Sequence, residues 1–544
     1  MHTFCEIRAG KRVFLGSRYG LLFRSQQEDP SMRTIGQAIV FGAGCLSIED
    51  VVAVSSGASV ALAADTAFRD RIDRGVSFLD KLLREDGVVY GVTTGYGDSC
   101  TVSIPREMVN ELPLQLTRFH GCGMGANLTP EQVRAVLACR LCSLTLGFSG
   151  VRYALLEQLV LLLQHNILPR IPEEGSVGAS GDLTPLSYVA AVLIGERDVF
   201  YEGKLRPTAE VFDELGISGI TLQPKEGLAL MNGTAVMTAL ACLAYSRAAY
   251  LARLATRITA MVSAAMHGNE FHFDEALFAL KPHPGQQQIA AWLCDDLKSQ
   301  RSPRNSKRLQ DRYSLRCAPH VIGVLQDSLP WLRSFIENEL NSANDNPLID
   351  GQNERVLHGG HFYGGHIAMA MDAMKTAVAN IADLLDRQLA QLVDPRFNHG
   401  LPANLSGADS ARAPLHHGFK AVQIAVSAWT AEALKLTMPA SVFSRSTECH
   451  NQDKVSMGTI AARDSLRVLE LTEQVAAACL LAGTQALQLR RRKRDLNEKH
   501  LSDSLLQMVA DVSASFALVE EDRPLEGDLR DMMRQIREQH WGLY

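Results

Sequence analysis

The sequence predicts a mainly α-helical protein organised as a bundle of long helices. Of its 544 residues, 46% are hydrophobic and 6% are aromatic, and several long stretches are rich in Ala and Leu. In these stretches apolar residues recur at helical spacing, Ala and Leu favour the helix, and Ala lets neighbouring backbones approach closely. Polar loops that contain glycine separate the stretches. We therefore expect a long-helix bundle with its loops at the two ends.

The first half of the chain predicts shorter helices and one hairpin. Thr129 is a capping residue, and Pro130 and the acidic Glu131 follow it, so the three form a helix start signal. Residues 199–207 predict a hairpin with a Glu-Gly pair at its turn. Helical periodicity covers residues 63–84, 107–117, 129–145, 151–165 and 183–194.

The second half of the chain predicts five longer helices. The charged segment 298–312 is expected to be a mobile excursion between two of them. The basic run 490–494 favours a solvated helix end over a nucleic-acid site. The five helices are expected at residues 227–266, 320–341, 366–393, 414–437 and 455–490.

Composition and charge exclude several classes of protein. Lys plus Arg total 54 and Asp plus Glu total 60, so the net charge is −6. A chain this apolar can offset its ordering entropy, which argues against disorder, and its net charge argues against a nucleic-acid binder with a basic surface. The longest apolar stretch, 235–266, is interrupted by Arg247, Arg253 and Arg257. It therefore fits a core helix better than a membrane span.

The eleven cysteines are scattered along the chain and suit a reducing cytoplasm. Cys139 and Cys142 form a CxxC inside a helical stretch, without a second CxxC or a nearby His pair. Buried packing is therefore favoured over a redox or zinc role. The sequence has no evident targeting segment, no HExxH or EF-hand spacing and no GxSxG, so metal-enzyme and hydrolase interpretations lack support.

The chain divides into an extension and one compact body. Residues 1–40 form an N-terminal extension that is expected to be poorly ordered, and Met32 is an alternative start. Residues 41–225 carry a glycine-rich loop, residues 226–490 form the central long-helix bundle, and residues 491–544 form a C-terminal helical tail.

Two segments place reactive side chains in a favourable setting. In YGVTTGYG, residues 90–97, Tyr90 could act as an acid or base if nearby cations or dipoles lowered its pKa. From this segment alone a structural aromatic turn is favoured. In DRYSLRCAPH, Tyr313 and Arg316 lie three residues apart and can share one helical face. The Arg side chain could pair a carboxylate through two hydrogen bonds or form a surface ion pair.

The glycine-rich loop GSVGASGDLTPLS, residues 175–187, has two interpretations. Glycines before a helix predict an anion-binding nest, although the Walker pattern is absent. Alternatively, the nitrogen of Gly181 can approach the carbonyl of Ala179 closely because glycine lacks a side chain. Ring closure with loss of two waters would give a 4-methylideneimidazol-5-one, with Ser180 supplying the methylidene carbon. Two amide-rich stretches, 339–348 and 448–458, predict polar pockets beside long helices.

Six motifs together resemble those of the aromatic amino acid ammonia-lyases and aminomutases, the family that includes histidine ammonia-lyase. They occur in the family's order as YGVTTGYG, GSVGASGDLTPLS, LMNGT, YSLRCAPH, NSANDNPL and HNQDKVSMG. The tail EDRPLEGD, residues 521–528, also resembles the family, whereas residues 1–40 lie outside the resemblance. A single ASG tripeptide carries little weight, but six motifs in one order are specific.

The resemblance implies a fold, a cofactor and an assembly. The fold is a long-helix bundle of the ammonia-lyase type, similar to fumarase and aspartase. The cofactor is the methylideneimidazolone (MIO) group formed from Ala179, Ser180 and Gly181, with no metal and no PLP. The assembly is a homotetramer with a central helical core, in which active sites are shared between chains.

The resemblance also implies roles for individual residues. Tyr90 would remove the β-proton, and Arg316 would hold the substrate carboxylate. Asn232 and Tyr313 would stabilise charge near the electrophile, which makes the substrate nitrogen a better leaving group. The matching positions of the substrate pocket are Gly97, Phe119, His120, Leu183, Asn344, His361, Phe362, Gln423 and Gln452.

The identity of the substrate depends on a few of these positions. Phenylalanine-selective members of the family resemble Phe-Leu where this chain has Phe119-His120, some tyrosine lyases carry His-His or His-Leu, and tyrosine aminomutases and histidine lyases carry Ser-His. His120 could hydrogen-bond a phenol or an imidazole. Histidine lyases typically place Glu where this chain has Gln452, and the GGHFYGGH segment differs from the usual NFHA or NFHG.

These residues favour L-tyrosine, which would give trans-4-coumarate and ammonia. Tyrosine 2,3-aminomutase, histidine ammonia-lyase and phenylalanine ammonia-lyase are alternatives, and Asp98 stands where some aminomutases carry an acid. A catalytically silent bundle kept as a binding protein is disfavoured, because Tyr90, the ASG segment and Arg316 are all intact.

Overall fold

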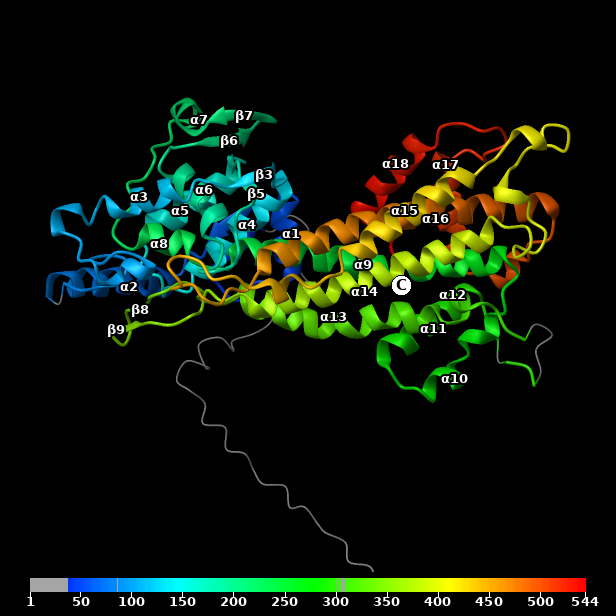
Figure 1. Ribbon diagram of the computed structural model, residues 1–544, viewed down its shortest axis with the longest axis horizontal. Coiled ribbons are helices and arrows are strands. Elements are labelled where there is room, and N and C mark those ends of the chain that lie inside the picture. Colours follow the sequence, from blue (N-terminus) through cyan, green and yellow to red (C-terminus); the bar gives the residue numbers. More distant parts are fainter. Residues whose placement is uncertain (1–37, 86, 301, 305–308) are drawn as a thin grey trace, which may run out of the picture.

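Two regions of different architecture make up the chain (Figure 1). Long helices form an extended bundle, and shorter helices with small sheets gather around one end of it. The computed structural model describes residues 38–544 apart from 86, 301 and 305–308. The expectations for residues 1–37, including a start at Met32, and for residues 301 and 305–308 of the charged segment lie outside the described residues.

The long helices of the bundle alternate in direction when they are taken in chain order, so the first and the last of them run parallel. Arg490, near the end of α16, donates from Nε to the carbonyl of Ala265 at the end of α9 (2.7 Å). Gln388, near the end of α14, donates to the carbonyl of Ser314 just before α13 (2.8 Å). The long helices are α9 (Ala235–Ala265), α13 (Ala318–Leu340), α14 (Gly365–Leu392), α15 (Lys420–Lys435) and α16 (Gly458–Lys493).

The two ends of this bundle differ in what surrounds them. We call the end at which α9 begins the Gly233 end, and the end at which α9 finishes and α13 begins the Tyr313 end. Ala, Leu and Val supply most of the buried side chains of α9 and α16. The mainly helical fold and the long-helix bundle that the sequence predicts are therefore confirmed.

Helix α9 is the core of the bundle. Among the described residues it is the one helix that is long and apolar enough to cross a membrane, but 78% of its most apolar window is buried inside the protein. Two of its arginines are neutralised, since Arg247 pairs with Glu473 (2.8 Å) and Arg257 with Asp296 (2.7 Å). The expected core helix is confirmed.

Short helices and strands precede α9 and cluster around the Gly233 end (Figure 1). The helices are α1 (Ile48–Ser55), α2 (Thr66–Glu85), α3 (Leu112–Phe119), α4 (Pro130–Leu144), α5 (Tyr153–Gln164), α6 (Leu183–Leu193), α7 (Thr208–Leu215) and α8 (Glu226–Met231). The strands are β1 (Ile39–Phe41), parallel to β2 (Val60–Leu62), then β3 (Met124–Asn127), antiparallel to β5 (Pro172–Glu174), and β4 (Leu168–Pro169), beside the hairpin of β6 (Asp198–Tyr201) and β7 (Lys204–Pro207).

The remaining elements connect or cover the long helices. The hairpin of β8 (Leu348–Asp350) and β9 (Arg355–Leu357) links α13 to α14. The others are the 3₁₀ helices η2 (Gly97–Thr101), η3 (Arg106–Met108), η4 (Glu270–Phe273), η5 (Ala403–Leu405), η6 (Ala413–Leu415), η7 (Ala440–Phe443) and η8 (Glu498–His500), and the α-helices α10 (Glu275–Ala279), α11 (Pro284–Asp296), α12 (Tyr313–Arg316), α17 (Asp503–Ser515) and α18 (Glu526–Arg537).

Several local predictions are confirmed. Thr129 caps α4 and forms a capping box with Gln132, and residues 199–207 form the predicted hairpin. Cys139 and Cys142 are buried in α4, and burial raises the pKa of both thiols. Buried packing is therefore the role that the CxxC has in this fold.

Two local predictions are wrong, and a third holds only in part. Residues 227–266 form two helices, because Asn232 and Gly233 (φ +150°) leave the helix to contact the glycine-rich loop. Residues 107–117 are divided between η3 and α3, with Pro113 in the first turn of α3. In the basic run 490–494, residues 491–494 are exposed at the end of α16 as predicted, but Arg490 is fully buried, because it pairs with Asp495 (2.8 Å) and donates to carbonyl groups.

Candidate active site

Ser180 lies at the Gly233 end, on the loop that joins β5 to α6. Its carbonyl accepts hydrogen bonds from Nδ2 of Asn232 (2.9 Å) and from the backbone nitrogen of Gly233 (3.3 Å). Its hydroxyl accepts a hydrogen bond from Nε2 of Gln452 (3.3 Å). Two donors on one carbonyl can stabilise negative charge that develops on its oxygen.

Gly181 can be nothing but glycine in this setting. Its φ is +69°, and a Cβ added there would collide with the backbone of Gly233. The two glycines form a parallel bridge, and the nitrogen of Asp182 donates to the carbonyl of Gly233 (2.8 Å). A tightly turned, side-chain-free backbone after Ala179 and Ser180 is what a cyclisation of these residues needs, so the residues present fit the expected ring.

Asp182 fixes this loop to the bundle, and sequence reasoning missed it as a site residue. The side chain is fully buried, and its Oδ2 accepts from the backbone nitrogens of Val236 (3.0 Å) and Met237 (2.9 Å) in the first turn of α9. Its Oδ1 accepts from the hydroxyls of Ser176 (3.0 Å) and Thr459. Burial raises the pKa of Asp182. The signal in the sequence is an acid directly after ASG.

A network of buried polar groups holds Asn232 through hydrogen bonds. The buried Arg140 donates to the carbonyl of Asn232 (3.1 Å) and to the hydroxyl of Ser143 (3.0 Å), which in turn donates to Asn344 (3.2 Å). The backbone nitrogen of Asn346 donates to Oδ1 of Asn232 (2.6 Å). Asn344, which the resemblance assigned to the substrate pocket, thus makes its described contacts with groups that hold Asn232.

Tyr90 lies on a loop beside this network. Its hydroxyl accepts a hydrogen bond from the backbone nitrogen of Gly97 (2.8 Å), and its ring meets that of His358 edge-on at 6.5 Å. Burial raises the pKa of Tyr90, the Gly97 hydrogen bond opposes this, and Glu448 adds to the rise. Within one chain the pKa of Tyr90 is therefore raised rather than lowered, because burial and a carboxylate outweigh one backbone dipole.

The segment 447–452 contacts both reactive loops. Its Gln452 bonds to Ser180, and its Glu448 accepts from the backbone nitrogen of Asp98 through Oε1 (2.8 Å). Glu448, Cys449 and His450 have φ values of 50°, 52° and 68°. Left-handed backbone costs non-glycine residues roughly 1–2 kcal/mol each, and such strain clusters at functional sites. Sequence reasoning quoted this segment but did not assign Glu448.

The expected ring-binding residues surround the same end. His120 follows α3, its Nδ1 bonds to the carbonyl of Leu116 (3.1 Å), and its ring lies 4.3 Å from that of the exposed Phe119. Burial lowers the pKa of His120. Leu183 begins α6, which packs against α3. His361 and Phe362 lie in the turn before α14, at the Gly233 end.

Tyr313 and Arg316 lie at the opposite end of the bundle. They share one turn, α12, and the Arg316 guanidinium lies 4.6 Å from the centre of the Tyr313 ring, so the shared face that the sequence predicts is confirmed. Tyr313 is 71% exposed, and among the described residues the buried Nε of Arg316 finds no acceptor. Gln423, at the start of α15, bonds to Ser427 (3.2 Å), which bonds to Asp386 near the end of α14.

One chain therefore does not bring the predicted site residues together. The 31 residues of α9 span about 46 Å at 1.5 Å per residue, and they separate the two groups. Tyr90, Gly97, the Ser180 loop, Asn232 and Gln452 form the group at the Gly233 end. Tyr313 lines a cavity of about 650 Å³ at the other end, together with Gln391, Phe397 and His399.

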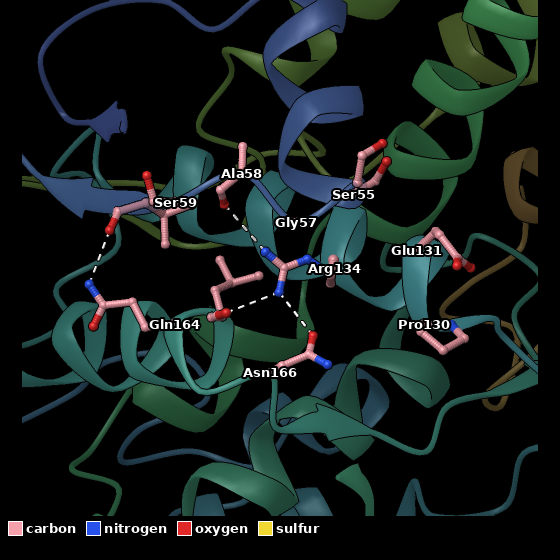
Figure 2. A pocket seen from close by; sticks show the side chains of 12 residues that line it. Ser55, Gly57, Ala58, Ser59, Pro130, Glu131, Arg134, Gln164 and Asn166 are labelled. Carbon is pink, nitrogen blue, oxygen red and sulfur yellow. Dashed lines mark hydrogen bonds between the residues drawn. The ribbon is translucent and has the colours of Figure 1, made fainter. Parts of the chain in front are cut away.

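A second cavity, of about 540 Å³, lies between α1, α4 and α5 (Figure 2). Arg134 occupies its centre and donates to the side chain of Asn166 (3.0 Å). It also donates to the carbonyls of Val54 (2.7 Å) and Leu163 (3.0 Å). The two carbonyls lie in the last turns of α1 and α5, where a helix dipole favours a cation. Arg134 thus anchors two helix ends, and no predicted site residue lines this cavity.

Known proteins resemble this chain in sequence and in fold. The family described as aromatic amino acid lyase matches residues 46–514. The chain is 40% identical over 451 residues to the histidine ammonia-lyase of Gloeobacter violaceus (82% of this chain, 87% of the relative) and 35% identical over 472 residues to that of Bacillus velezensis (86% and 90%). The solved structure of tyrosine aminomutase from Streptomyces globisporus superposes with a TM-score of 0.84 at 32% identity, covering 93% of this chain and 97% of that one.

Proposed function

Because the chain belongs to the aromatic amino acid lyase family and is therefore a carbon–nitrogen lyase, we propose that it is a tyrosine ammonia-lyase. The proposed reaction eliminates ammonia from L-tyrosine without oxidation and gives trans-4-coumarate. The observation that carries the reaction is the doubly hydrogen-bonded carbonyl of Ser180, next to a Gly181 that tolerates no side chain. The described residues contain no cluster of His, Cys, Asp or Glu that could hold a metal ion.

The proposed cofactor is the MIO group made from Ala179, Ser180 and Gly181. Once formed, this group supplies the electrophile that makes the substrate nitrogen a better leaving group. Asn232 and the nitrogen of Gly233 would hold charge on the Ser180 oxygen, and Tyr90 would take the β-proton. Loss of that proton and of the amine leaves the double bond of the product.

The preference for tyrosine rests on two neutral groups. The carbonyl of Leu116 can only accept, so Nδ1 of His120 donates to it, and the Nε2 of the neutral ring is left as an acceptor for a phenol. Gln452, which bonds to Ser180, is an amide and offers no negative charge to an imidazolium. Both features suit an uncharged hydroxyl at the ring end of the substrate.

We also propose that the working enzyme is a cytoplasmic homotetramer whose active sites are shared between chains. Arg316 and Tyr313 lie about one length of α9 from Ser180, so a second copy must supply the group that holds the substrate carboxylate. Val324, Met369 and Ile424 on the long helices are more than half exposed and suit contacts between copies. A cation brought near Tyr90 in this way would also lower the pKa of its hydroxyl.

Histidine is the second candidate substrate, because two relatives that are 35% and 40% identical to the chain are named histidine ammonia-lyases. A tyrosine aminomutase structure keeps the return of ammonia to the β-carbon open as well. Purified protein should be incubated separately with L-tyrosine, L-histidine and L-phenylalanine, and the products separated by chromatography. Coumarate from tyrosine supports the proposal, urocanate supports the histidine alternative, and a β-amino acid supports the aminomutase.

A further inference from the structure

The segment 447–452 is a short turn that connects two reactive loops far apart in sequence. At one end Gln452 bonds to the Ser180 hydroxyl, and at the other Glu448 bonds to the nitrogen of Asp98. Residues 447 and 452 pair as an isolated antiparallel bridge, and the hydroxyl of Thr447 donates to Oε1 of Gln452 (2.7 Å). The turn is therefore closed on itself and acts as one unit.

The backbone of this turn is held in an unusual conformation. Three consecutive residues other than glycine, 448–450, are left-handed. Such a run persists only where surrounding contacts determine it. Here two hydrogen bonds between side chains of the turn determine the conformation. Asn451 donates to Oε2 of Glu448 (2.8 Å), and the hydroxyl of Ser446 bonds to the His450 ring (2.8 Å).

Both oxygens of the Glu448 carboxylate are used in fixing geometry. Oε2 accepts from Asn451 within the turn, and Oε1 accepts from Asp98, the second residue of η2. Gly97, directly before Asp98, donates to the Tyr90 hydroxyl, and a Cβ at Gly97 would strike the Glu448 carboxylate. The chain of contacts therefore runs from Glu448 through adjacent backbone groups to the oxygen of Tyr90.

We propose that Glu448 is a positioning residue, whose carboxylate holds the Gly97–Asp98 backbone and thereby sets the Tyr90 hydroxyl against the Ser180 loop. This inference rests on the proposed function, since it assigns Tyr90 the role of base. Glu448 does not itself need to touch the substrate. Its negative charge adds a second effect, because a nearby anion stabilises the protonated phenol.

Two variants separate the hydrogen bond from the charge. Glu448→Gln keeps an oxygen for the Asp98 amide and, with Asn451 turned over, a partner within the turn, but it loses the charge. Glu448→Ala loses both. Glu202→Ala is the matched control, because Glu202 is also exposed and left-handed (φ 49°) but lies in the turn of the β6–β7 hairpin.

Activity should distinguish these variants. In Glu448→Ala we expect kcat to fall at least about tenfold, while KM changes less than about threefold because the carboxylate-binding Arg316 is intact. In Glu448→Gln we expect a kcat close to that of the unaltered enzyme, with the limb where activity rises with pH moved to lower pH. Removing the anion lowers the pKa of Tyr90, whereas the other groups that face it, Cys100, Tyr96 and His358, are unchanged.

Hydrogen exchange provides a readout that does not depend on turnover. Peptides covering residues 96–101 should exchange faster in Glu448→Ala than in Glu448→Gln or Glu202→Ala, while the melting temperature and the near-ultraviolet absorbance of the electrophile stay unchanged. Unaltered kcat and exchange in Glu448→Ala would overturn the inference. So would equal loss of kcat in both Glu448 variants with no shift of the pH limb. If the unaltered protein converts none of the three amino acids, the proposed function fails, and the exchange data still test the contact.

Discussion

The Gly233 end and the Tyr313 end of the bundle differ in how far hydrogen bonds and burial within one chain hold the expected site residues in place. At the Gly233 end, the Ser180 carbonyl has two donors, Asp182 is fully buried with four donors, and Asn232 accepts from Arg140 and from the backbone nitrogen of Asn346. At the Tyr313 end, by contrast, the side chain of Tyr313 is 71% exposed.

This difference shows which half of the chemistry a single chain organises. The Ser180 loop is held by hydrogen bonds within one chain, without a partner or substrate, as electrostatic preorganisation requires. Tyr313 and Arg316, which would bind the substrate, lie at the other end of the bundle, so their proposed role depends on a second copy of the chain. If the site is shared between copies as proposed, activity depends on assembly, because neither half of the site would act alone.

The largest effect is expected from Ser180→Ala. Without the serine hydroxyl, which must leave as water to give the methylidene group, the electrophile cannot form, so turnover should fall by at least about 10³-fold, as expected when a covalent catalyst is lost. Circular dichroism and the melting temperature should stay unchanged, because the hydroxyl has one 3.3 Å contact with Gln452. Substantial activity in this variant would contradict the assignment of Ser180.

The second prediction tests how much a buried ion pair at the Gly233 end contributes to the stability of the protein. Lys225 and Asp345 form a 2.5 Å ion pair there, and both side chains are fully buried. Asp345→Asn leaves the Lys225 ammonium without its counterion, which typically costs about 3–5 kcal/mol of stability. Calorimetry should show a clearly lower melting temperature.

The matched variant is Asp394→Asn at the Tyr313 end. Asp394 pairs with Arg396 (2.6 Å), whose side chain is 80% exposed, and exposed pairs contribute little. Its melting temperature should therefore stay near that of the unaltered protein. Equal shifts for Asp345→Asn and Asp394→Asn would mean that the buried pair contributes no more to stability than the exposed pair.

The third prediction tests the division of the site between copies. Arg316→Ala would remove the charge-assisted contact that we propose with the substrate carboxylate, so KM should rise roughly 30–100-fold, equivalent to about 2–3 kcal/mol. Ser180→Ala and Arg316→Ala chains, unfolded together and reassembled, should regain activity. With random assembly about a quarter of the sites would pair an intact Ser180 with an intact Arg316. No recovery from a correctly sized mixed oligomer would contradict shared sites.

The sequence predicts the parts of this molecule better than their junctions. Helical periodicity and the capping box at Thr129 are local, so the long helices, α4 and the β6–β7 hairpin were predictable. The break at Asn232 was not, because its cause is a hydrogen bond to Ser180, 52 residues away in sequence. The contact of Glu448 with Asp98 spans 350 residues and leaves no periodic signal.

The site residues show the same limit. The ASG segment and the pair Tyr313 and Arg316 could be recognised because motif order carries them. Their separation along α9 could not be, since spacing in sequence says nothing about which end of a helix a loop reaches. The raised pKa of Tyr90 depends on its burial and on Glu448, which only the folded chain brings near.

The smallest predicted effect concerns His120, which we propose contacts the ring end of the substrate. Its ring is neutral near pH 7, since burial lowers its pKa, and the bond of Nδ1 to the Leu116 carbonyl leaves Nε2 as an acceptor. In His120→Phe a tyrosine hydroxyl would lose this acceptor, whereas phenylalanine would lose nothing. The ratio of kcat/KM for L-tyrosine over L-phenylalanine should therefore fall about tenfold, equivalent to about 1.4 kcal/mol, measured by competition at pH 8.

Phe119→Leu is the control, because it changes the adjacent apolar ring and keeps the acceptor. A ratio that is unchanged in His120→Phe but altered in Phe119→Leu would show that shape, rather than a hydrogen bond, selects the substrate at this end of the bundle.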